Sequence, residues 1–222
     1  MKKLVIQDSE TIRKKVYTYV RDQILSGRIT PNHRLIETKI AQEIGTSRTP
    51  VREALHNLEM EGLVQAIPRI GYRVKGISAQ EVEEICEIRS VIEGLAARWA
   101  LEKAPDKAVK DLKRNISLTK AKISQGEIRA FIDLDAQFHE IIARCSGSTR
   151  LLEMSQSLRG HMLRYRVQSI FSEETVQQAL KGHLKILQAI EKGEAAEVLQ
   201  AMQQHLEESK QSILRHALKK EE

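Results

Sequence analysis

Hydrophobic positions recur at helical spacing through most of this 222-residue chain. Near the N-terminus one such stripe covers residues 10–26, and a second, shorter stripe covers residues 38–44. A third stripe begins beyond Gly45, where the chain is expected to turn, and covers residues 49–61. Three short helices are therefore predicted. Their inward positions are Ile12, Val16, Tyr19, Val20 and Ile24 on the first, Ile40, Ala41 and Ile44 on the second, and Val51, Ala54, Leu55 and Leu58 on the third.

Short strand-like segments accompany these helices. Residues 63–67 and 72–74 flank the turn sequence Pro68-Arg69-Ile70-Gly71 and predict a two-stranded hairpin, while residues 33–36 are compatible with one more brief strand. Three helices followed by a hairpin are typical of a winged helix-turn-helix. We assign residues 1–76 to this DNA-binding domain.

Strand signals cease near residue 78, and helical stripes separated by Pro or Gly follow to the C-terminus. The predicted helices cover about residues 79–103, 106–124, 127–145, 148–170, 173–192 and 194–217. The expected fold class is mainly α: an N-terminal winged helix-turn-helix and a C-terminal all-α antiparallel helical bundle. The bundle takes residues 77–222.

The third helix carries the chemistry of a DNA reader. Ser47 is placed to cap it, Pro50 fits its first turn, and Arg48 and Arg52 lie one turn apart on the face opposite the apolar stripe. Two guanidinium groups at a helix N-terminus can bond guanine edges or phosphates in a major groove. The predicted DNA-contacting residues are Ser47, Arg48, Thr49, Arg52, Arg69 and Gly71.

Charge is unevenly distributed along the chain. Residues 1–76 hold 14 Lys and Arg against 8 Asp and Glu, and the remaining residues hold 22 of each, from chain totals of 36 and 30. The whole net charge of +6 therefore belongs to the predicted DNA-binding domain. A basic first third joined to a neutral remainder suits a nucleic-acid reader fused to a sensing or assembly domain.

Other sequence features bear on location and redox state. No segment approaches the length and hydrophobicity of a membrane span, and the N-terminus lacks the apolar region of a signal peptide, so we expect a cytoplasmic protein without a membrane partner. Cys86 and Cys145 occur singly within helical stripes, which favours buried thiols over a disulfide or redox centre.

Metal-capable side chains lie on the apolar stripes of three bundle helices. Asp135 and His139 are one turn apart in residues 127–145, His183 is in line with the stripe of 173–192, and His205 is in line with that of 194–217. One Asp and three His can form a divalent metal site with mixed oxygen and nitrogen ligands. The same residues could instead be hydrogen-bonded core histidines and a buried Asp-His pair, because spacing alone does not direct the helices toward one centre.

The chain resembles the GntR-type transcription regulators, in the FadR-like subfamily whose effector domain is called FCD. The resemblance covers nearly the whole chain, and its most specific block is Thr46-Ser47-Arg48-Thr49-Pro50-Val51-Arg52-Glu53-Ala54-Leu55. Further matching segments, degenerate but in the right order, are Gly62-Leu63-Val64, Gly71-Tyr72-Arg73-Val74, Glu87-Ile88-Arg89 with Ile92-Glu93, Asp135-Ala136-Gln137-Phe138-His139, His183 with Ile186, and Met202 with His205-Leu206.

The resemblance implies a homodimer that binds a pseudo-palindromic DNA operator, usually as a repressor. It also implies that Asp135, His139, His183 and His205 hold a divalent metal ion, with Zn, Ni, Mn and Fe all compatible with these ligands. Six bundle helices, if residues 79–103 form one helix, are similar to the shorter VanR-like branch. Some relatives use an Arg for DNA where this chain has Thr38, so no DNA contact is assigned there.

The resemblance further implies that a small organic acid is the effector. Arg89 matches a position that often faces the ligand cavity, and a bidentate contact with a carboxylate would suit it. Arg89 could equally pair with Glu87, Glu93 or another acid of the bundle. Arg159 and Arg166 are weaker candidates for the same cavity.

Two other functions are compatible with parts of the pattern. The predicted metal could be purely structural in a ligand-independent DNA binder, or it could activate water in an enzyme. An enzyme is not expected, because Ala143 stands where a zinc-protease helix would carry its second His, and no phosphate-binding loop or nucleophile elbow occurs.

Overall fold

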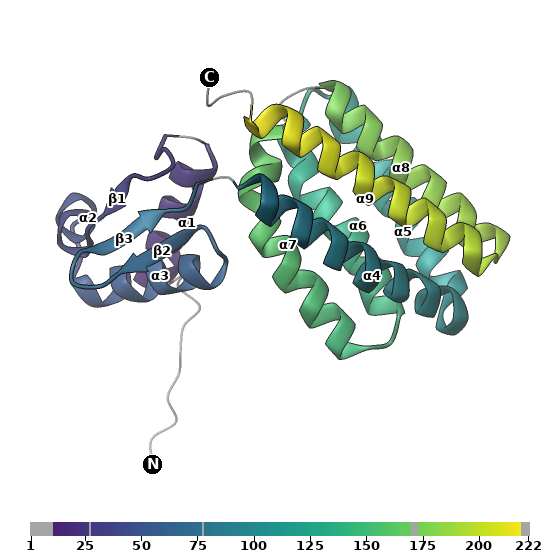
Figure 1. The fold of residues 1–222 in the computed structure, drawn as a ribbon, viewed down its shortest axis with the longest axis horizontal. Coiled ribbons are helices and arrows are strands. Elements are labelled where there is room, and N and C mark those ends of the chain that lie inside the picture. The colour runs from purple at the N-terminus through teal and green to yellow at the C-terminus, as the bar shows by residue number, and fades with distance from the viewer. Residues whose placement is uncertain (1–10, 27, 77, 170–172, 219–222) are drawn as a thin grey trace, which may run out of the picture. The chain divides into compact units, whose positions relative to one another are not determined.

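A computed structural model describes residues 11–26, 28–76, 78–169 and 173–218, and within these ranges it describes no side chains at 164, 166–169 and 216–218. Residues 10 and 170, at the edges of two predicted helices, lie outside the described residues. The chain divides into two compact units, residues 1–76 and 77–222 (Figure 1).

The first unit is a winged helix-turn-helix. Its elements are α1 (Ile12–Leu25), β1 (Arg34–Leu35), α2 (Glu37–Ile44), α3 (Arg48–Met60), β2 (Val64–Ile67) and β3 (Gly71–Val74). The three strands form an antiparallel sheet in the order β1-β3-β2, with Arg34 opposite Arg73 and Val64 opposite Val74. The turn between α2 and α3 depends on Gly45, which takes a left-handed conformation (φ 73°) that disfavours residues with a Cβ atom.

The core of this unit follows the predicted stripes with three exceptions. Its buried members include Val16, Val20 and Ile24 of α1, Ile40 and Ala41 of α2, and Val51, Ala54, Leu55 and Leu58 of α3. Ile12, Tyr19 and Ile44 are exposed, contrary to prediction. Ile12 and Ile44 are the first and last residues of their helices, and Tyr19 lies beside the narrow line of Val16, Val20 and Ile24, whose spacing of four residues marks the centre of the buried face.

The second unit is an α-helical bundle. Its elements are α4 (Ala79–Lys103), α5 (Pro105–Ser124), a 3-10 turn (Ile128–Ala130), α6 (Phe131–Cys145), α7 (Thr149–Ser169), α8 (Glu173–Lys192) and α9 (Ala195–Leu218). Residues 79–103 form one continuous helix, as the predicted count of six bundle helices requires. The helix predicted from residue 127 instead begins at Phe131, because a 3-10 turn, which is frequent at helix N-termini, precedes it.

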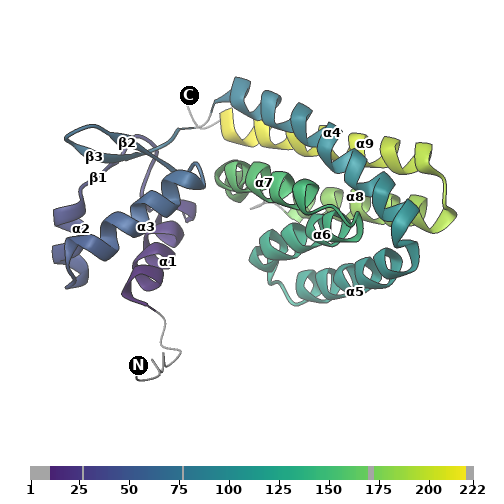
Figure 2. The same cartoon turned by 90° about the horizontal axis from the view of Figure 1, so that it is seen from below.

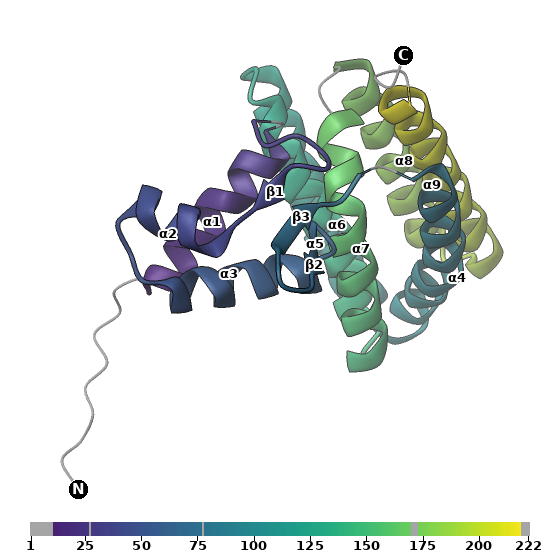
Figure 3. The same cartoon turned by 60° about the vertical axis from the view of Figure 1, so that its left-hand side comes forward.

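Helix α4 contacts α5, α6, α7 and α9. It packs along α9 on one side and against α6 and α7 on the other, while α8 packs beside α9 and α5 contacts α6 and α8 (Figures 2 and 3). The main hydrophobic core contains buried side chains from all six helices, among them Ile92, Leu112, Phe138, Leu151, Ile186 and Met202. No helix in the described part of the chain is long and apolar enough to cross a membrane.

Candidate DNA-reading surface and metal site

The N-terminus of α3 carries the predicted DNA-reading side chains. Ser47 is the N-cap residue, but its side chain makes no capping hydrogen bond, which corrects the predicted capping role. Ser47, Arg48, Thr49 and Arg52 are all exposed. The buried face formed by Val51, Leu55 and Leu58 directs the arginine-bearing face away from the core.

Both arginines are bonded to a single carboxylate, that of Glu37 in the first turn of α2. Arg52 donates from Nε to Glu37 Oε1 and from Nη2 to Oε2, both at 2.9 Å, and Arg48 donates from Nη2 to Oε2 at 3.2 Å. These hydrogen bonds, the one from Arg52 first, lower the pKa of Glu37 below its ordinary value. The carboxylate is therefore ionised at neutral pH.

The turn of the wing has an unusual backbone. Arg69 adopts a left-handed conformation (φ 65°) and is exposed, and Gly71 has φ 125°. A Cβ atom on Gly71 would lie 2.6 Å from the carbonyl oxygen of Leu35, so only glycine permits β3 to begin this close to β1. The structure thus assigns Gly71 a backbone role, while Arg69 is displayed at the tip of the hairpin.

The four predicted metal ligands come together inside the bundle. Asp135 and His139 lie on α6, His183 on α8 and His205 on α9, and all four side chains are buried. One candidate ligand atom from each residue lies within 4.8 Å of all the others. Sequence spacing alone could not establish this convergence.

The donor atoms of this Asp-His cluster fit a divalent cation. His139 Nε2 lies 3.3 Å from His205 Nε2, and Asp135 Oδ1 lies 3.3 Å from His183 Nε2 and 3.9 Å from His139 Nε2. Three imidazoles and one carboxylate form a mixed donor set that suits Zn, Ni, Mn or Fe. Ring nitrogens and a carboxylate oxygen that converge in a buried space are better satisfied by a cation than by one another.

Gly182 provides the space that His205 occupies. A Cβ atom at Gly182 would lie 2.3 Å from Nδ1 and 3.0 Å from Cγ of His205. Because Gly182 has no side chain, the imidazole of His205 on α9 can lie against the backbone of α8. In the sequence, the small residue immediately before His183 is the local signal of this close approach.

Glu93 of α4 connects the cluster to Arg89. His139 Nδ1 lies 2.5 Å from Glu93 Oε2, and Arg89 Nε donates to Glu93 Oε1 at 2.7 Å. Burial acts to raise the pKa of Glu93, but the charge of Arg89 and the contact with His139 outweigh it and hold this pKa well below its usual range. Burial also lowers the pKa of His139 to about 4, so its imidazole is neutral at pH 7. The Glu93 carboxylate stabilises a proton on Nδ1 and leaves Nε2 available as a donor atom toward the cluster.

The three arginines predicted to bind an effector differ in their surroundings. Arg89 is fully buried and paired with Glu93, one of the partners that the sequence left open, and its Nη1 has no hydrogen-bond partner among the described residues. Arg159 of α7 donates from Nη2 to Asp135 Oδ2 at 3.1 Å, with 12% of its side chain exposed. The side chain of Arg166 lies outside the described residues. Two arginines therefore border the Asp-His cluster, one of them near solvent.

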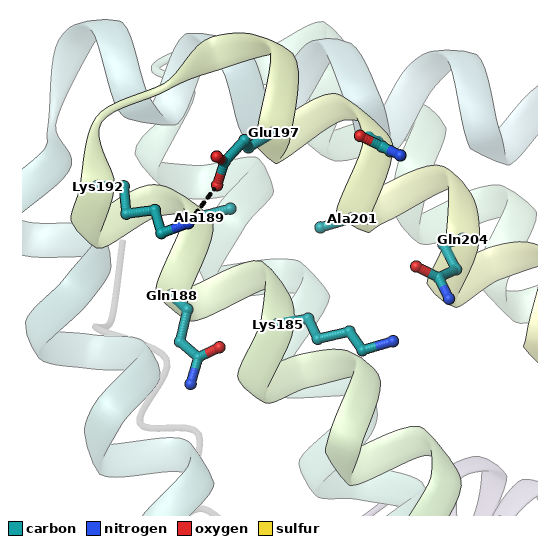
Figure 4. Close-up of a pocket in the computed structure, with 8 residues that line it drawn as sticks. Lys185, Gln188, Ala189, Lys192, Glu197, Ala201 and Gln204 are labelled. Carbon is teal, nitrogen blue, oxygen red and sulfur yellow. Dashed lines mark hydrogen bonds and ion pairs between the residues drawn. The ribbon is translucent and has the colours of Figure 1, made fainter.

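A shallow groove of about 290 Å³ lies elsewhere, on the outer side of α8 and α9 (Figure 4). Lys185, Gln188 and Gln204 line it, and Lys192 is bonded to Glu197 at one end. The groove includes none of the four cluster residues.

Comparisons with known proteins agree with this architecture. The sequence profile of the gntR family of bacterial regulatory proteins matches residues 12–74, and that of the FCD domain matches residues 84–208. The chain is 27% identical over 208 residues to the HTH-type transcriptional repressor RspR of Escherichia coli K12, covering 94% of this chain and 91% of that protein. It is 28% identical over 199 residues to the gluconate operon transcriptional repressor of Bacillus subtilis, covering 87% and 82%.

Solved structures share the fold. The E. coli McbR/YncC protein superposes with a TM-score of 0.74 at 21% identity, over 93% of this chain and 99% of that one. A regulator from Rhodococcus sp. RHA1, described as a putative GntR transcriptional regulator, gives 0.75 at 22% identity, over 91% and 97%. With a winged helix-turn-helix, an FCD-type bundle and matches that together cover most of the sequence, the chain belongs to the GntR family of DNA-binding transcriptional regulators.

Proposed function

We propose that the protein is a repressor that binds a pseudo-palindromic operator as a homodimer and responds to a small carboxylate metabolite. Its regulatory class follows from the family. One relative named as the gluconate operon transcriptional repressor and another named as a probable repressor of a D-xylose utilization operon support repression and a response to a metabolite. Because its target is chromosomal DNA, we place its activity in the cytoplasm. A purely regulatory role needs no enzymatic step.

DNA reading is assigned to α3 and the wing. The exposed guanidinium groups of Arg48 and Arg52 are the candidates for base-edge or phosphate contacts, and Arg69 at the hairpin tip is the candidate for an adjacent phosphate. Ser47 and Thr49 can donate hydroxyl hydrogen bonds to the backbone of the same duplex. A homodimer would present two such surfaces to the two half-sites of an operator.

A divalent metal ion is proposed to be held by Asp135, His139, His183 and His205. Such an ion would supply a concentrated positive charge that attracts anionic oxygen ligands. The chain's own residues prepare for it. Glu93 holds the His139 imidazole by Nδ1, and Arg159 fixes the orientation of the Asp135 carboxylate.

The charge balance around the cluster is the observation that carries the choice of effector. Arg89 and Arg159 contribute two positive charges, Glu93 and Asp135 contribute two negative charges, and burial keeps His139 neutral. A divalent cation beside these four charges adds two positive charges that they do not compensate, which is costly in a buried space. A carboxylate metabolite would compensate them, with the Nη1 group of Arg89 as one hydrogen-bond donor.

Regulation would then be a shift between two populations of the bundle. A carboxylate that binds one arrangement of α4, α6, α8 and α9 more tightly than another changes the equilibrium that sets operator affinity. No chemical change of the effector is required. The metal supplies binding energy in this scheme and catalyses nothing.

The experiment is elemental analysis of the purified protein beside the Asp135→Ala, His139→Ala double variant, with footprinting on the DNA that flanks its own gene. About one metal per chain in the wild type, lost in the variant, together with a discrete palindromic footprint, is the expected result. A metal-free wild type with an intact footprint would remove the metal from the proposal and keep the repressor.

A further inference from the structure

One carboxylate organises both arginines of the candidate DNA-reading helix. Glu37 accepts two hydrogen bonds from Arg52 and one from Arg48, although it lies on the preceding helix, eleven and fifteen residues away in the sequence. The Glu37 side chain is 15% exposed, whereas the side chains of Arg48 and Arg52 are 58% and 61% exposed. The acid therefore lies beneath two outward-facing guanidinium groups.

The hydrogen-bonding pattern leaves a defined part of Arg52 available. Glu37 occupies the edge of the guanidinium formed by Nε and Nη2. The remaining two-donor edge is the end formed by Nη1 and the outer hydrogen of Nη2, since a guanidinium has five N–H donors in a fixed planar fork. That end has the spacing needed to donate to O6 and N7 of guanine.

We propose that Glu37 is a positioning residue for base reading, which holds Arg52 end-on toward a guanine in the operator. The proposal rests on the DNA-reading role assigned to Arg52 above. An exposed Arg side chain samples many rotamers, and contact with a base would have to order it. A pair already formed in the absence of DNA reduces the ordering that remains to be done at the interface.

The location of Glu37 supports a lasting pair. It lies in the first turn of α2, where the positive end of the helix dipole stabilises a carboxylate. The same hydrogen bonds lower its pKa. The pair is thus in place across the pH range in which the protein would bind DNA.

A blocking role for Glu37 makes the opposite prediction. If the acid only masked the two arginines and repelled phosphates, removal of its charge would strengthen binding to the operator at least as much as binding to unrelated DNA. Positioning and masking therefore differ in the ratio of specific to non-specific affinity.

The test compares Glu37→Gln with Glu43→Gln, a control on the same helix whose residue is exposed and whose substitution changes net charge equally. Three duplexes are used: one selected by the wild-type protein from a randomised pool, a shuffled duplex of the same composition, and the selected duplex with 7-deazaguanine at single guanines. Anisotropy at fixed salt gives the affinities. Glu37→Ala is measured in parallel, so that poor folding of one variant does not decide the result.

Glu37→Gln is expected to reduce the ratio of selected to shuffled affinity about tenfold, while Glu43→Gln keeps the wild-type ratio. One 7-deazaguanine, which lacks the N7 acceptor, should weaken the wild type and the control but have little further effect on Glu37→Gln. An unchanged or increased ratio in both Glu37 variants would overturn the positioning role.

An Arg52→Ala arm separates this inference from the function on which it rests. If Arg52→Ala lowers the ratio and both Glu37 variants do not, Arg52 reads DNA without Glu37. If Arg52→Ala leaves the ratio unchanged, the base-reading role of Arg52 itself is wrong, and the positioning role fails with it.

Discussion

His183 is the one residue that α8 contributes to the Asp-His cluster. Its ring stacks on Phe138 with 3.8 Å between centroids, so packing fixes its orientation as well as its position. Because this packing already restricts the ring, the His183 side chain would lose little conformational freedom on binding a metal ion.

His183→Ala is therefore expected to lower metal content and to destabilise the bundle by about 2–4 kcal/mol, through loss of the ligand and of the stacked ring. His161→Ala, on the less buried α7 position, is the control. Metal analysis and thermal unfolding measure the two effects. Unchanged metal content in His183→Ala would exclude this residue from the ligand set.

The metal-free protein should also show a pH dependence that originates at His139. Burial lowers its pKa from an ordinary 6.5 to about 4 in the folded chain, so between these values the unfolded state binds more protons. Stability is then complete above pH 6.5 and falls as the pH drops toward 4, by up to about 3 kcal/mol.

Denaturant unfolding of chelator-treated protein across this pH window measures the effect. His139→Gln is expected to have a shallower slope than the wild type, and His161→Gln the wild-type slope. A slope that is the same in all three proteins would assign the acid sensitivity to other groups.

At the scale of elements, the approach of α9 to α8 is set by one missing side chain. Gly182→Ala would place a methyl group 2.3 Å from His205 Nδ1, so the imidazole must leave its position or the helices must separate. We expect reduced metal content and a loss of stability, although alanine favours a helix over glycine by about 0.5–1 kcal/mol.

Gly160→Ala is the matched control for this change. Gly160 lies within α7, and a Cβ atom there would meet nothing within 4 Å. The control should gain stability from its helix propensity and keep its metal, as judged by thermal unfolding and elemental analysis. Full metal occupancy in Gly182→Ala would show that His205 does not need this close approach.

The elements themselves were largely predictable from the sequence. Helical periodicity located every α-helix of the described residues, and turn residues such as Gly45 and Pro105 marked breaks between them, because these signals are local in the chain. The 3-10 turn before α6 and the exposure of Ile44 were not foreseen. Both depend on how a helix end packs, which periodicity does not encode.

The sequence indicated which residues belong to the candidate sites, but it did not indicate the contacts between them. The inward spacing of Asp135, His139, His183 and His205 indicated candidates, but their convergence depends on how three helices cross. Glu93 could have been noticed because it follows Arg89 by one helical turn, whereas its contact with His139 joins α4 to α6. Glu37 carried no sequence signal for its arginine partners, because the pairing is created by the turn between α2 and α3.

At the scale of the whole molecule, charge is divided between the units according to their tasks. The excess of six positive charges lies in residues 1–76, where DNA is proposed to bind, and residues 77–222 are balanced overall. The same balance recurs locally around the Asp-His cluster, where two arginines offset two carboxylates. A divalent cation bound there would add positive charge that these four residues do not offset.

This balance predicts that carboxylates stabilise the protein only when metal is bound. In a thermal-shift screen of small mono-, di- and hydroxycarboxylates, metal-loaded protein should show increases in melting temperature that metal-free protein lacks, since a ligand at a hundred times its Kd adds about 2.7 kcal/mol. Arg89→Gln should reduce the increase while it retains metal, because Arg89 is bonded to Glu93 and is not one of the four candidate ligands. Lys113→Gln, an exposed change on α5, should respond as the wild type does. Equal shifts in metal-free and metal-loaded protein would separate the carboxylate site from the Asp-His cluster, and no shift in either would favour a structural metal.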